Sequence, residues 1–303
     1  MKSLMYHYVR NFNKEYPYSN YLDKKIFIKQ IKSFSKKGII SDPEEIFTGK
    51  NKFILTFDDG LRDHLWVSEE LKKNNCIGIF FIPTLPFEKK EILAVHKTHL
   101  ILSKVGGKPA LEKFNYLLRK KKIKNLINSK EKSRYVKAYK LQKNIEETTT
   151  FKKIMNYYGN FEIINKILNE LMKYFEINIS SRKFYLTKKE IKHMVSLGMV
   201  IGGHTHNHIL LSRLNYKKQF NEISTCKKLL EKITKKECNL LSFPYGREYS
   251  YNRNTINILK KLNFKNAFSV DYRNINKNDL KNKSFELPRY DCNLFTDNLN
   301  NEK

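Results

Sequence analysis

The segment Phe53-Ile54-Leu55-Thr56-Phe57-Asp58-Asp59-Gly60 combines a short apolar run with two acidic residues and a glycine. A β-branched and aromatic run of this length predicts a buried strand, and its acid-acid-Gly ending predicts that the strand delivers two carboxylates to a turn. Adjacent carboxylates repel each other, so a positive group must lie beside them if both are to stay ionised. A metal ion would supply that charge; the alternative is a plain Asp-Asp-Gly turn.

Candidate partners for such an ion follow a second apolar run, Met199-Val200-Ile201, in the segment Gly203-His204-Thr205-His206-Asn207-His208. The imidazoles of His204 and His208 are four residues apart and can point the same way from a helical turn. With one carboxylate they form a 2-His-1-carboxylate set, which binds a divalent metal and leaves coordination positions open. The spacing also occurs in His-Glu-x-x-His proteases, but the Glu is missing here and the pair follows a strand. The alternative is two surface histidines in a loop.

Thr56-Phe57-Asp58-Asp59-Gly60, followed by His204-Thr205-x-x-His208, resembles the polysaccharide deacetylase family, also called the NodB-homology or carbohydrate esterase 4 family. A third segment, Ser242-Phe243-Pro244-Tyr245-Gly246, resembles that family's Pro-Tyr-Gly motif. The resemblance covers roughly residues 1–85 and 185–292. It implies an α/β fold, a distorted (β/α)7 barrel with a helical insertion, and metal-dependent removal of N-acetyl groups from amino sugars.

The resemblance also implies roles for the residues of the first two motifs. Asp59, His204 and His208 are expected to hold a divalent metal, with Zn²⁺ as the expected ion and iron or cobalt left open. Asp58 is expected to be the general base, because a carboxyl beside a cation stays ionised and ready to take a proton from water. His206 alternates away from its neighbours and is expected to support the ligands rather than to be one.

In the third motif, the backbone N–H of Tyr245 is expected to form an oxyanion hole together with the metal; the alternative is an ordinary Pro-Tyr-Gly turn. Family members often carry an Arg two residues before this Pro, and here that position is Ser242. An Arg that orients the base must therefore come from elsewhere or be absent. Arg289, which follows a predicted strand in Leu287-Pro288-Arg289-Tyr290-Asp291, is the candidate.

The catalytic acid is expected to be His7. Many family members carry a late Leu-x-x-His strand for this role, and no histidine follows Tyr245 in this chain. Some members resemble a circular permutation with the acid His on an early Tyr-His strand, and Met5-Tyr6-His7-Tyr8-Val9 resembles that variety. The alternative is a core histidine on an apolar strand.

Apolar runs of strand length alternate with helical spacing on both sides of the middle of the chain, which predicts βα units and a parallel sheet or barrel. The expected strands, about seven, are at 3–9, 52–57, 76–83, 199–203, 239–243, 266–270 and 285–290. The three motifs lie at strand ends, where such barrels have their active sites. We expect one domain over residues 1–303, with a helical, Lys-rich insertion at 87–182 that caps the site, contacts a partner, lies on a membrane or is simply solvated.

The composition is globular, with 40% hydrophobic and 13% aromatic residues, and strongly basic, with 59 Lys and Arg against 30 Asp and Glu, a net charge of +29. Such a field attracts nucleic acid, anionic lipid headgroups or acidic glycans, although a Lys-rich chain also results from a genome poor in G and C. No nucleic-acid motif is present, so nucleic acid is not an expected partner.

No apolar stretch reaches the roughly 18–20 residues that span a bilayer, and the N-terminal segment does not have the pattern of a signal peptide. The expected location is the cytoplasm, or the cell envelope if the natural chain starts further upstream, and peripheral membrane contact stays open. The four cysteines, which are scattered, are expected to be reduced; they are Cys76, Cys226, Cys238 and Cys292.

The predicted function is removal of N-acetyl groups from a polysaccharide or glycan precursor that contains amino sugars. One alternative keeps the site and changes the substrate to a nucleotide- or lipid-linked sugar, with formyl or acetyl as the acyl group. A remote alternative is a non-catalytic barrel that binds anionic polymers, for which the +29 charge is the only argument. The sequence leaves the sugar, the acyl group and the metal open.

Overall fold

The computed structural model describes residues 1–38, 47, 53–123, 126–127, 129–140, 142 and 144–296. Contacts divide the chain into two compact units. The first, which we call the barrel unit, is Met1–Asn11, Tyr21–Lys90 and Ser181–Lys303; the second, the helical unit, is Phe12–Asn20 and Glu91–Ser180. The short N-terminal segment of the helical unit was not expected from the sequence. A single domain with an insertion at 87–182 stays an interpretation.

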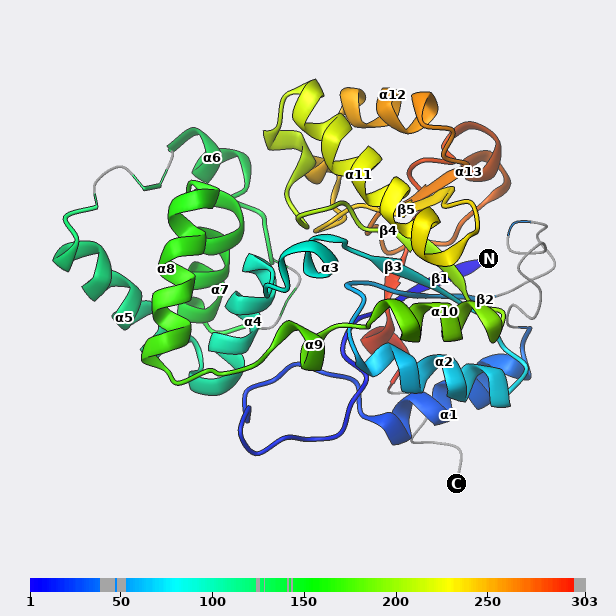
Figure 1. Cartoon of the computed structure of the whole chain (residues 1–303), viewed down its shortest axis with the longest axis horizontal. Coiled ribbons are helices and arrows are strands. Elements are labelled where there is room, and N and C mark those ends of the chain that lie inside the picture. The colour runs from blue at the N-terminus through cyan, green and yellow to red at the C-terminus, as the bar shows by residue number, and fades with distance from the viewer. Residues whose placement is uncertain are drawn as a thin grey trace. The chain divides into compact units, whose positions relative to one another are not determined.

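The barrel unit contains seven parallel strands in one sheet, in the order β6-β5-β4-β3-β2-β1-β7. The strands are β1 (Lys2–Tyr6), β2 (Phe53–Phe57), β3 (Gly78–Ile82), β4 (Val200–Gly203), β5 (Leu240–Ser242), β6 (Asn266–Phe268) and β7 (Tyr290–Asp291). The predicted α/β class, with seven curled parallel strands and helices around them, is confirmed (Figure 1).

The last segment, residues 287–291, links the two edges of the sheet. Leu287 donates its N–H to the Ala267 carbonyl at 2.9 Å and accepts from the Ser269 N–H at 2.8 Å, which ties it beside β6. Two residues later, β7 pairs with β1. The strand predicted at 285–290 is therefore wrong in extent: Pro288 has no N–H to give to a ladder, and regular pairing resumes only beyond it.

Helices surround the strands. The longer ones are α1 (Lys24–Ser35), α2 (Asp63–Lys73), α10 (Lys188–Ser196), α11 (Tyr216–Thr234) and α12 (Arg253–Lys261), and the shorter ones are α3 (Leu85–Lys89), α9 (Ser181–Phe184) and α13 (Lys277–Asn282). Helix α2 packs on α10, α10 on α11, and α11 on α12 (Figure 1). The predicted capping box is present, with the Thr187 side chain accepting from the Glu190 N–H and the Glu190 carboxylate accepting from the Thr187 N–H.

Both faces of the central strands are buried, which explains why β2 and β3 are apolar without alternation. On one face, the Phe57 ring stacks between Tyr6 and Phe80, with centroids 4.9 and 4.7 Å away. This rigid core fixes the positions at which the strands end, and so fixes where the residues that follow them lie.

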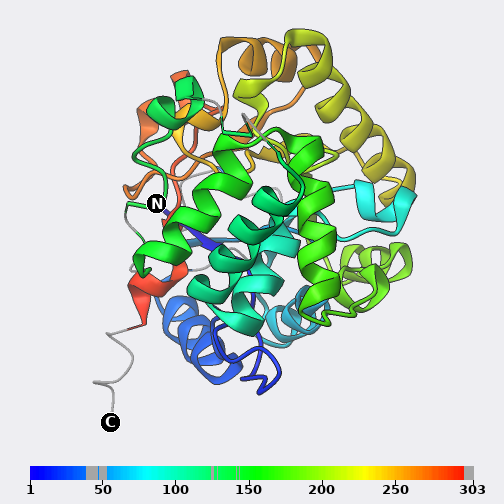
Figure 2. The same ribbon diagram turned by 90° about the vertical axis from the view of Figure 1, so that its left-hand side faces the viewer.

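The helical unit contains α4 (Ala94–Val105), α5 (Gly107–Lys120), α6 (Ser129–Arg134), α7 (Glu146–Lys153) and α8 (Phe161–Tyr174). Helix α4 packs on α5 and α8, and α5 packs on α7. Figure 2 shows these helices lying side by side. Phe114, Phe151 and Leu168, one from each of α5, α7 and α8, are fully buried. The segment at 12–20 joins this unit through the Tyr18 N–H, which donates to the Ser103 carbonyl at 3.0 Å. Within the part of the chain that the structure describes, no helix has both the length and the apolar character needed to cross a membrane.

Candidate active site

The two acidic residues lie in a strained turn at the carboxyl end of β2. The Asp58 N–H donates to the Tyr6 carbonyl at 2.9 Å, which continues the β1–β2 pairing up to the first acid. Asp59 then adopts φ 82° and Gly60 φ 60°. A Cβ at Gly60 would lie 2.8 Å from Ile82 Cγ2, so the turn requires glycine there. Non-glycine residues with positive φ persist only where the surroundings hold them, and they concentrate at functional sites.

The two histidines converge on the second acid from the end of β4. Nε2 of His204 lies 3.4 Å, and Nε2 of His208 lies 3.2 Å, from Asp59 Oδ1. One ligand atom from each of the three residues lies within 4.8 Å of the others, and all three side chains are buried. The structure therefore brings together, from positions almost 150 residues apart, the three residues predicted to hold a metal.

The hydrogen bond on the other nitrogen of His204 tests whether this cluster fits a cation. Nδ1 lies 2.8 Å from the Ser242 backbone carbonyl, which can only accept, so Nδ1 carries the proton. In the neutral ring Nε2 then presents a lone pair to the Asp59 carboxylate, and either a proton on Nε2 or a cation between the two groups would remove the repulsion. Burial lowers the pKa of His204, but Asp58 and Asp59 outweigh it and the pKa is raised. The donor set thus suits a divalent metal.

The other carboxylate, Asp58, is held by an arginine from the far end of the chain. Arg289 donates from both terminal nitrogens to the two Asp58 oxygens, at 2.8 Å each, and is itself fully buried. It also donates to the hydroxyls of Ser242 at 2.7 Å and Thr56 at 3.1 Å, and its Nε donates to the Ser269 carbonyl at 3.1 Å. The Ser242 hydroxyl in turn donates to Asp58 Oδ2 at 3.1 Å.

This network sets the charge of Asp58. Burial alone would raise the pKa of the carboxyl, but Arg289 and His204, with a smaller contribution from His7, lower it below its usual value. A carboxylate offers about four lone-pair sites, and Arg289 and Ser242 together take three of them. Among the residues that the structure describes, the remaining site is on Oδ1, so Asp58 is a fixed, ionised acceptor with one direction left open.

His7 lies directly after β1, beside these acids, and it is half-buried. Its carbonyl lies 2.9 Å from Nε2 of His64, the second residue of α2. The His64 ring is fully buried against Phe57 and Phe80. Burial, the largest influence, lowers the pKa of His64 and favours the neutral ring, which anchors the backbone at His7.

Tyr245 lies in the turn after β5, close to the histidine cluster. Its ring centroid is 5.2 Å from that of His208, and the residue adopts φ 65°. The next residue, Gly246, adopts φ 66° and accepts at its carbonyl from the Val270 N–H at 2.7 Å. Two consecutive left-handed residues reverse the chain sharply and hold the Tyr245 backbone beside the site.

Some contacts around the site were not anticipated from the sequence. The sequence marks Ser242 only as the position where an arginine is missing, yet its hydroxyl bridges Arg289 and Asp58. Its place at the end of a strand, next to the Pro-Tyr-Gly turn, is the signal that could have identified it. His64 and Glu222 are on amphipathic helices and carry no such signal.

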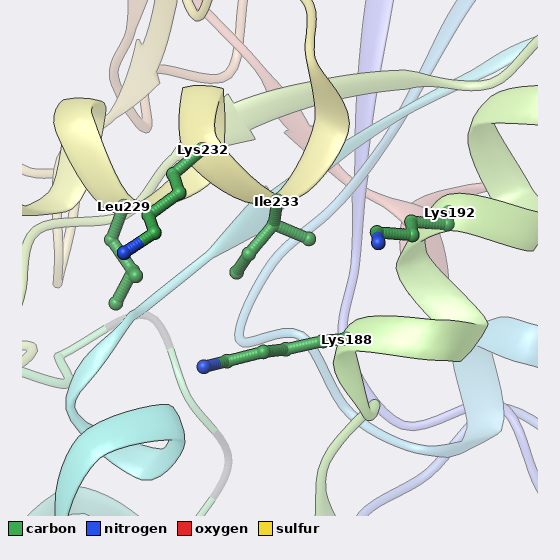
Figure 3. Close-up of a pocket in the computed structure, with 5 residues that line it drawn as sticks. All are labelled: Lys188, Lys192, Leu229, Lys232 and Ile233. Atoms are coloured by element: carbon green, nitrogen blue, oxygen red, sulfur yellow. The ribbon is translucent and has the colours of Figure 1, made fainter.

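A separate surface pocket of about 180 Å³ lies between α10 and α11, outside the strands (Figure 3). Its lining consists of three exposed lysines and two apolar side chains, Lys188, Lys192, Lys232, Leu229 and Ile233. It contains none of the acids or imidazoles described above, so the candidate site for chemistry is the buried cluster at the strand ends.

The fold and the site define a class of protein: a barrel of parallel strands with a candidate metal centre at their carboxyl ends. Comparison with known proteins narrows this class. The sequence profile described as polysaccharide deacetylase matches residues 141–267. YxkH of Bacillus subtilis (strain 168), provisionally named a polysaccharide deacetylase, is 28% identical over 89 residues, which is 29% of this chain and 31% of that relative. These matches support the polysaccharide deacetylase family that the three motifs resemble.

Solved structures share the fold across the whole chain. The deacetylase PplD of Streptococcus pyogenes has a TM-score of 0.59 and 17% identity, covering 96% of this chain and 91% of its own. IcaB of Ammonifex degensii has a TM-score of 0.54 and 13% identity, covering 96% and 90%. The Bacillus cereus polysaccharide deacetylase BC0361 has a TM-score of 0.55 and 15% identity, covering 98% and 68%. At these identities the likeness concerns the fold alone.

Proposed function

We propose that this chain is a metal-dependent hydrolase that removes N-acetyl groups from an amino sugar in a polysaccharide or glycan precursor. One observation carries the proposal: a buried cluster of Asp59, His204 and His208 lies beside a second carboxylate, Asp58, that a buried arginine orients. The match to the polysaccharide deacetylase profile and the shared fold of PplD, a deacetylase whose structure was determined in complex with acetate, support the same reaction.

Asp59, His204 and His208 would hold the metal, with Zn²⁺ as the expected ion. When bound, the ion would polarise the acyl carbonyl and lower the pKa of a water molecule. With these three side chains as its ligands, the metal would keep its other coordination positions open for water and substrate.

Asp58 is the proposed general base. Its lowered pKa keeps it ionised at neutral pH, and its one open acceptor direction on Oδ1 would receive the proton of the attacking water. Arg289 and Ser242 hold the Asp58 carboxylate in place, so the carboxylate need not reorient when the substrate binds. Arg289 thus takes the role of the arginine that is missing at position 242.

Two further residues would complete the reaction. The Tyr245 N–H would donate to the oxygen that becomes negative as water adds to the acyl carbon. His7, in its protonated form, would give its proton to the sugar nitrogen as the C–N bond breaks. The water oxygen ends in acetate, and the nitrogen leaves as a free amine. This assignment of His7 corresponds to the permuted variety of the family with an early Tyr-His strand.

Acyl release by the purified chain tests the proposal. Protein stripped of metal and reloaded with Zn²⁺ would be incubated with N-acetyl and N-formyl amino sugars, each free, nucleotide-linked, lipid-linked or in oligomers. We expect acetate release that requires both Zn²⁺ and Asp58, with Asp58→Asn as the inactive control. Formate in place of acetate would change the substrate and keep the site. Failure to bind metal, or equal release by Asp58→Asn, would contradict the proposal.

A further inference from the structure

A carboxylate on α11, that of Glu222, holds the loop that joins the two proposed histidine ligands. Glu222 Oε2 accepts the N–H of His206 at 3.1 Å and that of Asn207 at 2.8 Å, and Oε1 accepts from the Asn207 side-chain amide. All three hydrogen bonds reach the residues between His204 and His208. Charge-assisted bonds from a carboxylate to backbone N–H groups are among the stronger hydrogen bonds in proteins.

This loop has a conformation that it would not adopt by itself. Thr205 has φ 61° and His208 has φ 53°, and a β-branched residue at positive φ is a marked outlier. The Thr205 hydroxyl accepts the His208 N–H at 3.1 Å, which closes a tight turn around the second ligand. Such strain persists only where surrounding contacts over-determine the backbone.

Contacts from the other side of the loop come from residues just after β3. The Leu85 N–H donates to the His206 carbonyl at 2.9 Å, and the Thr84 hydroxyl lies 2.9 Å from His206 Nδ1. His206 therefore supports the loop and lies outside the ligand cluster, as the sequence suggested. Glu222 on α11 and the contacts from the segment after β3 hold the loop from two elements. The orientation of His208 toward Asp59 depends on these contacts.

We propose that Glu222 is a positioning residue for the metal site: it fixes the 205–208 turn so that His208 meets Asp59 and His204 at one ion. The inference rests on the proposed function, because it requires that the cluster bind a metal. Residues that orient metal ligands typically change metal affinity 10–100-fold when they are replaced. Glu222 acts on His208 through the backbone of the loop. Its replacement should therefore change the position of the His208 imidazole and the affinity of the site for the ion.

The test compares two glutamates on the same helix. Glu222→Gln keeps the shape but removes the charge and one of the two acceptor oxygens, so the bond from the Asn207 amide is lost and the two backbone bonds are weakened. Glu231→Gln is the matched control, because Glu231 also accepts a backbone N–H, from Cys238 at 3.1 Å, and pairs with Lys227 at 2.9 Å, away from the site. The Zn²⁺ dissociation constant of the full chain would be measured with a competing chelator, and the melting temperature of each metal-free variant would be recorded.

We expect Glu222→Gln to bind Zn²⁺ about 10–100-fold more weakly and to change the visible spectrum of the Co²⁺-loaded protein. Glu231→Gln should stay within about twofold of the parent at a similar loss of melting temperature. Glu222→Asp, which keeps the charge on a shorter stem, should recover part of the affinity, and it replaces the Gln variant if that one fails to fold.

Wild-type affinity in Glu222→Gln, or equal losses in both Gln variants, would overturn the role of Glu222 and leave the proposed function standing. Absence of Zn²⁺ binding by the parent chain would overturn the proposed function and this inference with it.

Discussion

The two sides of the candidate site neutralise adjacent carboxylates in different ways. On one side, Asp58 has its own protein cation, Arg289, which binds both oxygens at 2.8 Å. On the other, Asp59 faces two imidazoles, of which His204 presents a lone pair in its neutral form. A carboxylate that an arginine neutralises within the fold is suited to moving a proton, and a carboxylate that faces two imidazole nitrogens is suited to holding a metal.

Replacing each acid in turn tests most strongly whether Asp58 and Asp59 have different roles. Asp59→Asn should abolish both Zn²⁺ retention and acyl release, because it removes a ligand charge from a three-residue set. Asp58→Asn should reduce acyl release by about 10²–10⁴-fold, the usual contribution of a general base, while Zn²⁺ affinity changes little. Metal content and initial rates measured on the same preparations check both outcomes. Equal loss of metal in the two variants would show that the two acids do not differ in role.

The second prediction concerns the arginine side and has a matched control. Arg289→Met leaves the buried Asp58 carboxylate without its cation, and should lower the free energy of unfolding by about 3–5 kcal/mol. Arg273→Met breaks a similar two-pronged pair with the buried Asp279, but Arg273 is 40% exposed and the Asn276 N–H still donates to the Asp279 carboxylate, so the loss should be smaller, about 1–2 kcal/mol. Urea unfolding followed by the fluorescence of Trp66, the single tryptophan, measures both.

Similar losses in the two variants would contradict the distinction between a pair in which both side chains are fully buried and a pair whose arginine is partly exposed. Arg289→Lys sharpens the test further. Lysine keeps the charge but cannot bind both oxygens of Asp58, so it should recover stability better than acyl release.

Only part of this site could be predicted from the sequence. Which part depends on the distance along the chain that each contact spans. The clustering of Asp59 with His204 and His208 was predictable, because both motifs follow apolar runs and parallel strands end at the same edge. The capping box at Thr187 was predictable for the opposite reason: it is local. Both rest on patterns of a few residues.

The other contacts of the site depend on how the sheet closes. The sequence offered Arg289 as a candidate partner of Asp58 because it follows a predicted strand, but it lies 231 positions away and reaches Asp58 only because residues 287–291 bridge β6 and β1. That bridge also explains the error in the last strand, since Pro288 interrupts its pairing. The contacts of Glu222 could not be predicted because a glutamate on a helix is normally a solvated residue. Only the fold shows which loop lies against it.

The smallest predicted effect is the pH dependence of the Arg273–Asp279 pair. Hydrogen bonds from Arg273, the largest influence, lower the pKa of Asp279 against the effect of burial. Stability from a lowered carboxyl pKa is fully present above the unfolded value of about 3.9 and is lost as the pH falls through the folded value. The difference in unfolding free energy between the parent and Arg273→Met should therefore be constant from pH 7 to about 5 and shrink below about pH 4. A difference that grows toward low pH would contradict this sign.

The most direct test of the account is the position of the metal itself. Crystals of the Zn²⁺-loaded chain, measured on both sides of the zinc absorption edge, would locate the ion by its anomalous scattering. We predict one strong peak bonded to an Asp59 oxygen, His204 Nε2 and His208 Nε2, with Asp58 still held by Arg289. A peak bonded to Asp58, or the absence of a peak at these three residues, would contradict the division of roles between the two acids.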